Sequence, residues 1–127
     1  MSRPVLLDAS FLIALERETA RGVVGPARRF LPQLRNRPLA ISIVTVEELL
    51  EGAADEQTTL RALQRFAVQG LHLAEARRCA LRQRRAPRRM GENDAWLMAT
   101  ADGLDADVIG ADRAAFERLG RRYLRFR

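Results

Sequence analysis

The chain contains no lysine, one cysteine, one histidine and few aromatic residues. All 22 basic residues are arginine, which excludes reaction mechanisms that depend on a lysine side chain. The single cysteine, Cys79, cannot form an internal disulfide, and this is consistent with a reducing compartment. No apolar run approaches the roughly 18 residues that a membrane-spanning helix needs. These absences favour a cytoplasmic protein that does not enter a membrane.

Length and composition indicate one globular domain. The 127 residues are 47% hydrophobic and 30% charged, and a chain of this length buries roughly two thirds of its surface on folding. We therefore expect a single domain over residues 1–127. The net charge of +6 favours a polyanionic partner such as nucleic acid, although a bias toward GC-rich codons accounts for the lack of lysine equally well.

Short apolar runs alternate with amphipathic segments, which predicts an α/β fold. Strands are expected over residues 4–7, 39–43, 70–73, 107–109 and 123–126. Helices are expected over residues 10–16, 28–34, 45–54, 57–67, 75–85, 93–104 and 113–119. Such alternation is typical of a central parallel sheet, here of four to five short strands, with helices on both faces. Sites in these folds form beyond the carboxyl ends of the strands.

Four acidic residues stand where a predicted strand gives way to a helix: Asp8, Glu48, Asp94 and Asp112. Three of them have a structural alternative. Thr45 and Glu48 have the spacing of a capping box, whereas Asp94 and Asp112 could charge or cap the first turn of a helix. Four carboxylates at one end of a sheet would nevertheless repel one another, and a cation would remove that repulsion. Oxygen ligands suit Mg²⁺ or Mn²⁺, whereas zinc would recruit histidine or cysteine.

The stretches that carry these acids resemble the four sequence blocks of the PIN-domain nucleases, specifically the VapC-like toxins of VapBC toxin–antitoxin pairs. They read VLLDASFLIA, SIVTVEELLEGA, GENDAWLMATA and VIGADRAAFERL, and the resemblance extends from Val5 to about Phe116. The string NDAWLMATA is the most specific. The E-L-x-x-G pattern of the second block selects Glu48 over Glu47. The fourth block departs from the family because Gly110 stands where a hydroxyl residue is usual.

This resemblance implies a single PIN-like domain that acts as a metal-dependent endoribonuclease. Asp8, Glu48, Asp94 and Asp112 would be the catalytic ligands of Mg²⁺ or Mn²⁺, with Ser10 and Asn93 in support. The resemblance also implies an RNA substrate, a cognate antitoxin protein and a homodimer. The alternative that Gly110 keeps open is a catalytically weak or inactive PIN-fold binding module that acts through a partner protein.

The densest group of basic residues would supply RNA contacts around the acidic site: Arg82, Arg84, Arg85, Arg88 and Arg89. The alternative for this group is a solvated helix end and loop in an arginine-rich protein.

Two further classes, receiver domains and haloacid-dehalogenase-type phosphatases, also place acids and Mg²⁺ at strand ends. Both use a lysine near the phosphoryl group, which this chain lacks. The phosphatases also need a D-x-D pair, and Ser10 occupies its second position.

Overall fold

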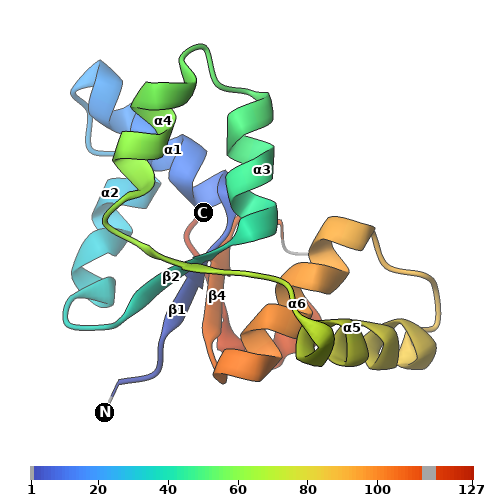
Figure 1. Cartoon of the computed structure of the whole chain (residues 1–127). Coiled ribbons are helices and arrows are strands. Elements are labelled where there is room, and N and C mark those ends of the chain that lie inside the picture. The colour runs from blue at the N-terminus through green and yellow to red at the C-terminus, as the bar shows by residue number, and fades with distance from the viewer. Residues whose placement is uncertain (1, 113–116) are drawn as a thin grey trace.

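The computed structural model describes residues 2–112 and 117–127 around a five-stranded parallel sheet (Figure 1). Its strands are β1 (Val5–Leu7), β2 (Leu39–Ser42), β3 (Ala67–Gln69), β4 (Asp107–Gly110) and β5 (Tyr123–Arg125). Their spatial order is β3-β2-β1-β4-β5, so β1 is central and β3 and β5 form the edges. Every pairing is parallel. The predicted fold class, an α/β domain with a parallel sheet, is confirmed.

Helices fill the connections between the strands. They are α1 (Ala9–Arg21), α2 (Pro26–Phe30), α3 (Ile43–Glu51), α4 (Glu56–Leu63), α5 (Leu73–Arg85) and α6 (Glu92–Leu104). Two short 3-10 helices, η1 (Leu31–Leu34) and η2 (Glu117–Arg122), complete the described secondary structure. Figure 1 shows α5 and α6 together on one side of the strands and α1 and α2 on the other. Within the described ranges, no helix has the length and apolar character needed to cross a bilayer.

The sheet separates two apolar cores because successive strand residues point to opposite faces. In β1, Val5 and Leu7 belong to the core that α1 to α4 cover, whereas Leu6 belongs to the core beneath α5 and α6. Helices on both faces bury all three side chains. This explains why the central strand reads as an uninterrupted apolar run that ends at an acid.

The alternative considered for Thr45 and Glu48, a capping box, is not formed in the structure. Helix α3 begins at Ile43, and its N-cap is Ser42, whose Oγ accepts a hydrogen bond from the backbone N–H of Val44 at 3.1 Å. Strand β2 passes into the helix without a loop, so the cap lies three residues earlier than predicted. Thr45 is completely buried inside the first turn, and Glu48 has no part in capping.

Several predicted boundaries also differ from the structure. The third strand lies at 67–69 rather than 70–73, because His72 is the N-cap of α5 and its backbone N–H donates to Glu75 Oε1 at 2.9 Å. The helix predicted over 28–34 is divided into α2 and η1, and Pro32, which lacks an N–H, lies in the second part. The helix predicted over 113–119 falls partly outside the described residues, and 117–122 forms η2.

A buried carboxylate joins α1 to α2. Glu18 accepts hydrogen bonds from the backbone N–H groups of Gly25, Ala27 and Arg28 at 2.9, 3.0 and 2.8 Å. Burial acts to raise the pKa of Glu18, but these donors outweigh burial and the net shift is downward. Glu18 therefore supplies the N-terminal cap of α2, which Gly25 has no side chain to provide.

Candidate functional site

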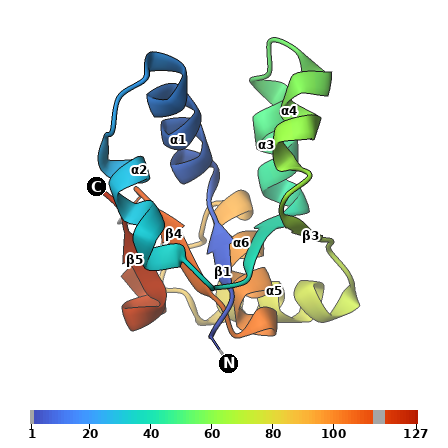
Figure 2. The ribbon, with the colours of Figure 1, turned by 90° about the vertical axis from the view of Figure 1, so that its left-hand side faces the viewer.

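The sheet and helix α1 together fix the position of Asp8. Strand β1 ends beside β4, with Leu7 opposite Ile109, and the backbone N–H of Asp8 donates to Ile109 O at 3.0 Å. Asp8 is also the N-cap of α1, because its carboxylate accepts the backbone N–H of Ser10 at 3.4 Å. Figure 2 shows β1 pointing toward the end of the sheet where α1 begins. The predicted position beyond a strand's carboxyl end is therefore confirmed for Asp8.

Ser10 connects Asp8 to the segment that leaves β4. Its hydroxyl donates to Asp8 Oδ2 at 2.6 Å and accepts the backbone N–H of Ala111 at 3.1 Å. The hydroxyl hydrogen has one acceptor and the oxygen has one donor, so the orientation of this group is determined. Ser10 thus restrains the half-buried Asp8 carboxylate.

Helices α3 and α6 bring two further acids to this end of the molecule. Glu48 is half-buried on α3, and Asp94 is half-buried in the first turn of α6. The Asn93 side chain acts to lower the pKa of Glu48, which places its amide beside the Glu48 carboxylate. Glu47 is instead exposed, and its pKa is raised mainly by its neighbour Glu51. Glu48 is thus the member of the pair that lies near the other acids, and its role as a ligand stays a prediction.

The acids influence one another's ionisation. Burial raises the pKa of Glu48, and the charges of Asp8 and Asp94 raise it further. Burial likewise raises the pKa of Asp94, with added contributions from Asp112 and Asp8. Burial is also the main cause that raises the pKa of Asp8, against the opposing hydrogen bonds from Ser10. Asp8 and Asp94 thus lie within electrostatic range of Glu48, and Asp112, the most exposed of the four, lies within range of Asp8 and Asp94.

The carboxylates are near one another without converging. Across residues 2–112 and 117–127, no three histidine, cysteine, aspartate or glutamate side chains are close enough to hold one metal ion. Repulsion between ionised carboxylates opposes closer approach in the absence of a cation. The donor set, which is entirely oxygen, suits Mg²⁺ or Mn²⁺. The nitrogen and sulfur side chains that zinc would recruit lie elsewhere. His72 is the N-cap of α5, and Cys79 is buried in the core beneath that helix.

Tyr123 is a neighbour of the acids that its position in the sequence did not indicate. Burial raises the pKa of Tyr123, and the charges of Asp8 and Asp112 raise it further. The residue opens the edge strand β5, where it pairs with Val108 of β4. Only the strand order brings it beside the site, and local spacing carries no signal of that order.

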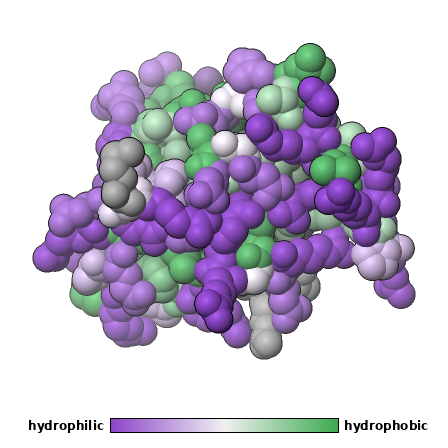
Figure 3. Space-filling model, turned by 90° about the horizontal axis from the view of Figure 1, so that it is seen from below, coloured by the Kyte–Doolittle hydropathy of each residue, from purple (hydrophilic) through white to green (hydrophobic). Residues whose placement is uncertain are grey.

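The predicted basic cluster has two parts. Arg82 is bound to Asp102 of α6, through Nε at 2.6 Å and Nη2 at 2.8 Å, and only 22% of its side chain is exposed. The other four members are exposed: Arg84, Arg85, Arg88 and Arg89. The surface seen from below Figure 1, on the side of α5, is mainly hydrophilic (Figure 3). Contact between these four exposed arginines and RNA stays a prediction.

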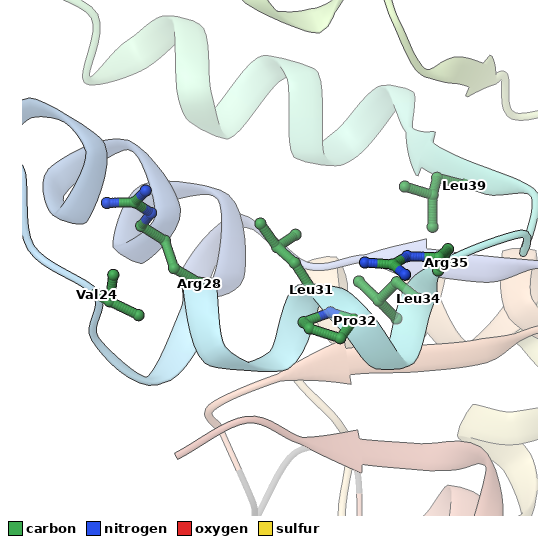
Figure 4. A pocket seen from close by; sticks show the side chains of 7 residues that line it. All are labelled: Val24, Arg28, Leu31, Pro32, Leu34, Arg35 and Leu39. Atoms are coloured by element: carbon green, nitrogen blue, oxygen red, sulfur yellow. The ribbon is translucent and has the colours of Figure 1, made fainter.

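An open pocket of about 510 Å³ lies on the α2 side of the molecule. Its lining is Val24, Arg28, Leu31, Pro32, Leu34, Arg35 and Leu39. Figure 4 shows Leu31 and Pro32 between the side chains of Arg28 and Arg35. None of the four predicted acids contributes to it. The pocket is therefore an apolar surface separate from the acidic site.

Comparisons with known proteins agree with the fold and with the sequence blocks. The PIN domain family model matches residues 5–122. The chain is 36% identical over 109 residues to Ribonuclease VapC10 of Mycobacterium tuberculosis (strain CDC 1551 / Oshkosh), a match that covers 82% of this chain and 79% of that protein.

Solved structures share the fold across nearly the whole chain. A toxin–antitoxin complex from Klebsiella pneumoniae has a TM-score of 0.78 at 23% identity and covers 97% of this chain and 98% of its own. VapBC-1 from nontypeable Haemophilus influenzae has a TM-score of 0.72 at 22% identity, with the same coverage of 97% and 98%. The family model and the curated relative both extend over most of the sequence, and the chain belongs to the PIN-domain family.

Proposed function

We propose that this protein is a divalent-metal-dependent endoribonuclease and the toxin of a cytoplasmic toxin–antitoxin pair. The observation that carries the proposal is the gathering of acids at one end of the sheet: Asp8 follows β1, Glu48 lies on α3 and Asp94 lies in the first turn of α6, and neighbouring acids, Asp112 among them, act on the pKa of each. Membership of the PIN-domain family and 36% identity to a protein named as a ribonuclease support it. A cluster of carboxylates without a cation would repel RNA, so the proposed activity requires metal.

The residues suited to hold Mg²⁺ or Mn²⁺ are Asp8, Glu48 and Asp94, while Asp112 would complete that site or a second one. When bound, the cation supplies an activated water and neutralises charge on the scissile phosphate. The protein's part is orientation. Ser10 restrains Asp8 through a hydrogen bond, and the Asn93 amide lies beside Glu48, so these two side chains would orient the ligands as they close around the cation.

The exposed arginines would bind the RNA backbone. Arg88 and Arg89 lie in the segment that leads into α6, a few residues before Asp94, so a phosphate bound by them would lie near the acids. Arg84 and Arg85, at the end of α5, would extend the same basic surface. Arg82 is occupied by Asp102, which makes it the weakest candidate of the predicted cluster.

An antitoxin is the proposed protein partner. The Klebsiella pneumoniae neighbour is a toxin–antitoxin complex by name, and the Haemophilus influenzae neighbour is named VapBC-1. The α2 pocket offers an apolar surface for an amphipathic helix, because Val24 and Leu31 are 58% and 39% exposed. An arginine further along such a segment would suit the carboxylates and compete with the cation. We also expect a homodimer, which light scattering after size-exclusion chromatography would test.

RNA cleavage by a matched pair of variants tests the proposal. Asp94→Asn and Asp102→Asn make the same change in the same helix, but Asp94 faces the other acids and Asp102 pairs with Arg82. We expect Mn²⁺-dependent cleavage by the parent, a loss of about a hundredfold in Asp94→Asn, and retained cleavage in Asp102→Asn below its melting temperature. A parent protein that binds its partner but cleaves no RNA in Mn²⁺ would favour the inactive binding module instead.

A further inference from the structure

The side chain of Gln83, near the end of α5, makes two hydrogen bonds to the backbone of Met90. Its Nε2 donates to Met90 O at 3.0 Å, and its Oε1 accepts the backbone N–H of Met90 at 2.9 Å. A side-chain amide that satisfies both peptide groups of one residue replaces the pairing that a neighbouring strand would give. Met90 is buried and its two hydrogen bonds to Gln83 are partly buried, so removal of Gln83 would leave these backbone groups to partial hydration. Gln83 thus ties the end of the segment between α5 and α6, just before α6 begins, back to α5.

The first turn of α6 has no side-chain N-cap. Its N-cap is Gly91, which has no side chain to accept the first N–H groups. The helix begins at Glu92, two residues after Met90, and the backbone N–H of Ala95 donates to Gly91 O at 2.9 Å. An ion pair between Arg89 and Glu92 at 3.3 Å also spans the helix start, but both side chains are exposed and such a pair contributes little. The two hydrogen bonds from Gln83 therefore hold the residue that precedes the N-cap of α6.

The same first turn carries two residues of the proposed site. The Asn93 amide lies beside the Glu48 carboxylate on α3, and the Asp94 carboxylate is influenced by Asp8 and Asp112. A shift of the helix start would move both side chains relative to α1 and α3. Such a shift would weaken any cation site that needs acids from three helices.

We infer that Gln83 is a positioning residue: by holding Met90 it sets the first turn of α6 and so places Asn93 and Asp94 against Glu48. This inference rests on the proposed function only for its effect on the cation, because the placement itself exists in the metal-free protein. Gln83 acts through the backbone and touches none of the acids.

A second contact between the two helices provides an internal comparison. Arg82 of α5 binds Asp102, which lies two turns after Asp94 in α6. This contact therefore holds the end of α6 that is far from the acids. Loss of that contact loosens α5 from α6 without releasing Met90. Asp102→Asn is therefore the control for a general weakening of the helix pair, and Gln64→Met, at an exposed glutamine at the end of α4, is the control for the substitution itself.

The test uses the whole protein with Gln83→Met, which preserves the volume of the side chain and removes both hydrogen bonds. In the metal-free protein we expect amide exchange at residues 90–94 to become about tenfold faster, and the Asn93 side-chain amide resonances to shift toward those of a solvated amide. Calorimetric titration with Mn²⁺ should show about tenfold weaker affinity. Gln83→Glu, which keeps the acceptor and loses the donor, should fall between the parent and Gln83→Met. Neither control should change amide exchange at residues 90–94 or the affinity for Mn²⁺ by more than about twofold. Neither control should shift the Asn93 side-chain resonances.

Unchanged exchange at residues 90–94 and unchanged Asn93 resonances in both Gln83 variants would overturn the inference, whatever the cation does. Faster exchange with undiminished Mn²⁺ affinity would also overturn it, because Gln83 would then support the loop and not the site. A parent protein that binds no Mn²⁺ would contradict the proposed function instead. In that case the Asn93 resonances alone decide whether Gln83 places the first turn of α6.

Discussion

The Asp8 carboxylate packs against the backbone of Gly110, where a Cβ atom would lie 3.1 Å from Asp8 Oδ2 and 3.2 Å from Asp8 Cβ. Glycine therefore leaves the space that Asp8 occupies. Ser10 supplies the polar contact between Asp8 and the exit from β4, through the backbone N–H of Ala111. The missing hydroxyl at position 110 thus coincides with an ordered, hydrogen-bonded Asp8.

Adding a side chain at position 110 should disturb Asp8. In Gly110→Ala the new methyl group would make the Asp8 carboxylate move by a few tenths of an ångström. We expect Mn²⁺ affinity, measured by calorimetric titration, to fall by about tenfold. Gly52→Ala is the control, because a Cβ there meets no atom within 4 Å. Equal or tighter binding by Gly110→Ala would show that Asp8 does not depend on this packing.

Removing the charge of Asp8 should stabilise the metal-free protein. Burial raises the pKa of Asp8, so the ionised form is destabilising in the native state. Such a carboxyl lowers stability above its native pKa, and that loss disappears as the pH falls toward the unfolded value of about 3.9. Asp8→Asn should therefore melt above the parent in EDTA at pH 7, with a smaller difference at pH 4. In Mn²⁺ the order should reverse, and an Asp8→Asn protein that is less stable in both conditions would contradict this account.

The ion pairs of Asp102 should have the opposite pH dependence. Burial acts to raise the pKa of Asp102, but hydrogen bonds from Arg82 and Arg122 outweigh it, and the net shift is downward. The stabilisation is therefore present above the unfolded pKa of about 3.9 and is lost as the pH falls through the lower native value. Asp102→Asn should lower the free energy of unfolding by about 2 kcal/mol at pH 7. Urea titrations at pH 7 and pH 3 check this, and a difference that persists unchanged at pH 3 would rule out the ionic cause.

The two candidate caps of α3 should respond differently to substitution. Ser42→Ala removes the cap and should cost about 1 kcal/mol of stability. Thr45→Val should be neutral or stabilising, because Thr45 Oγ1 is buried and has no hydrogen-bond partner among the described residues. Thermal melting of both variants in EDTA provides the comparison. A larger loss in Thr45→Val than in Ser42→Ala would restore the capping box.

The hydrophobic pattern of the sequence predicted the central strand, where burial decides the residue types. The apolar run at 5–7 ends at Asp8 because a central strand is buried on both faces, and its carboxyl end meets the site. The edge strand β3 gave no such signal. Val68, at its centre, is 48% exposed, and pairing with β2 rather than burial maintains the strand.

The remaining differences depend on contacts between distant segments. The T-x-x-E spacing at Thr45 was a valid capping pattern, but Ser42 caps first because β2 continues directly into α3. Tyr123 reaches the acids only because β5 lies beside β4. Gln83 binds Met90 seven residues later, across the segment between α5 and α6, and no local sequence pattern indicates this contact. Family resemblance selected Glu48 over Glu47, which the helical pattern alone did not decide.

The most direct test of the central claim is RNA cleavage in Mn²⁺ by the neighbouring variants Glu48→Gln and Glu47→Gln. The two substitutions are chemically identical, and only Glu48 is influenced by Asp8 and Asp94. We expect Glu48→Gln to lose cleavage by about a hundredfold while melting at or above the parent's temperature in EDTA, and Glu47→Gln to cleave as the parent does. Full cleavage by Glu48→Gln, or an equal loss in both variants, would show that Glu48 does not serve in a metal site.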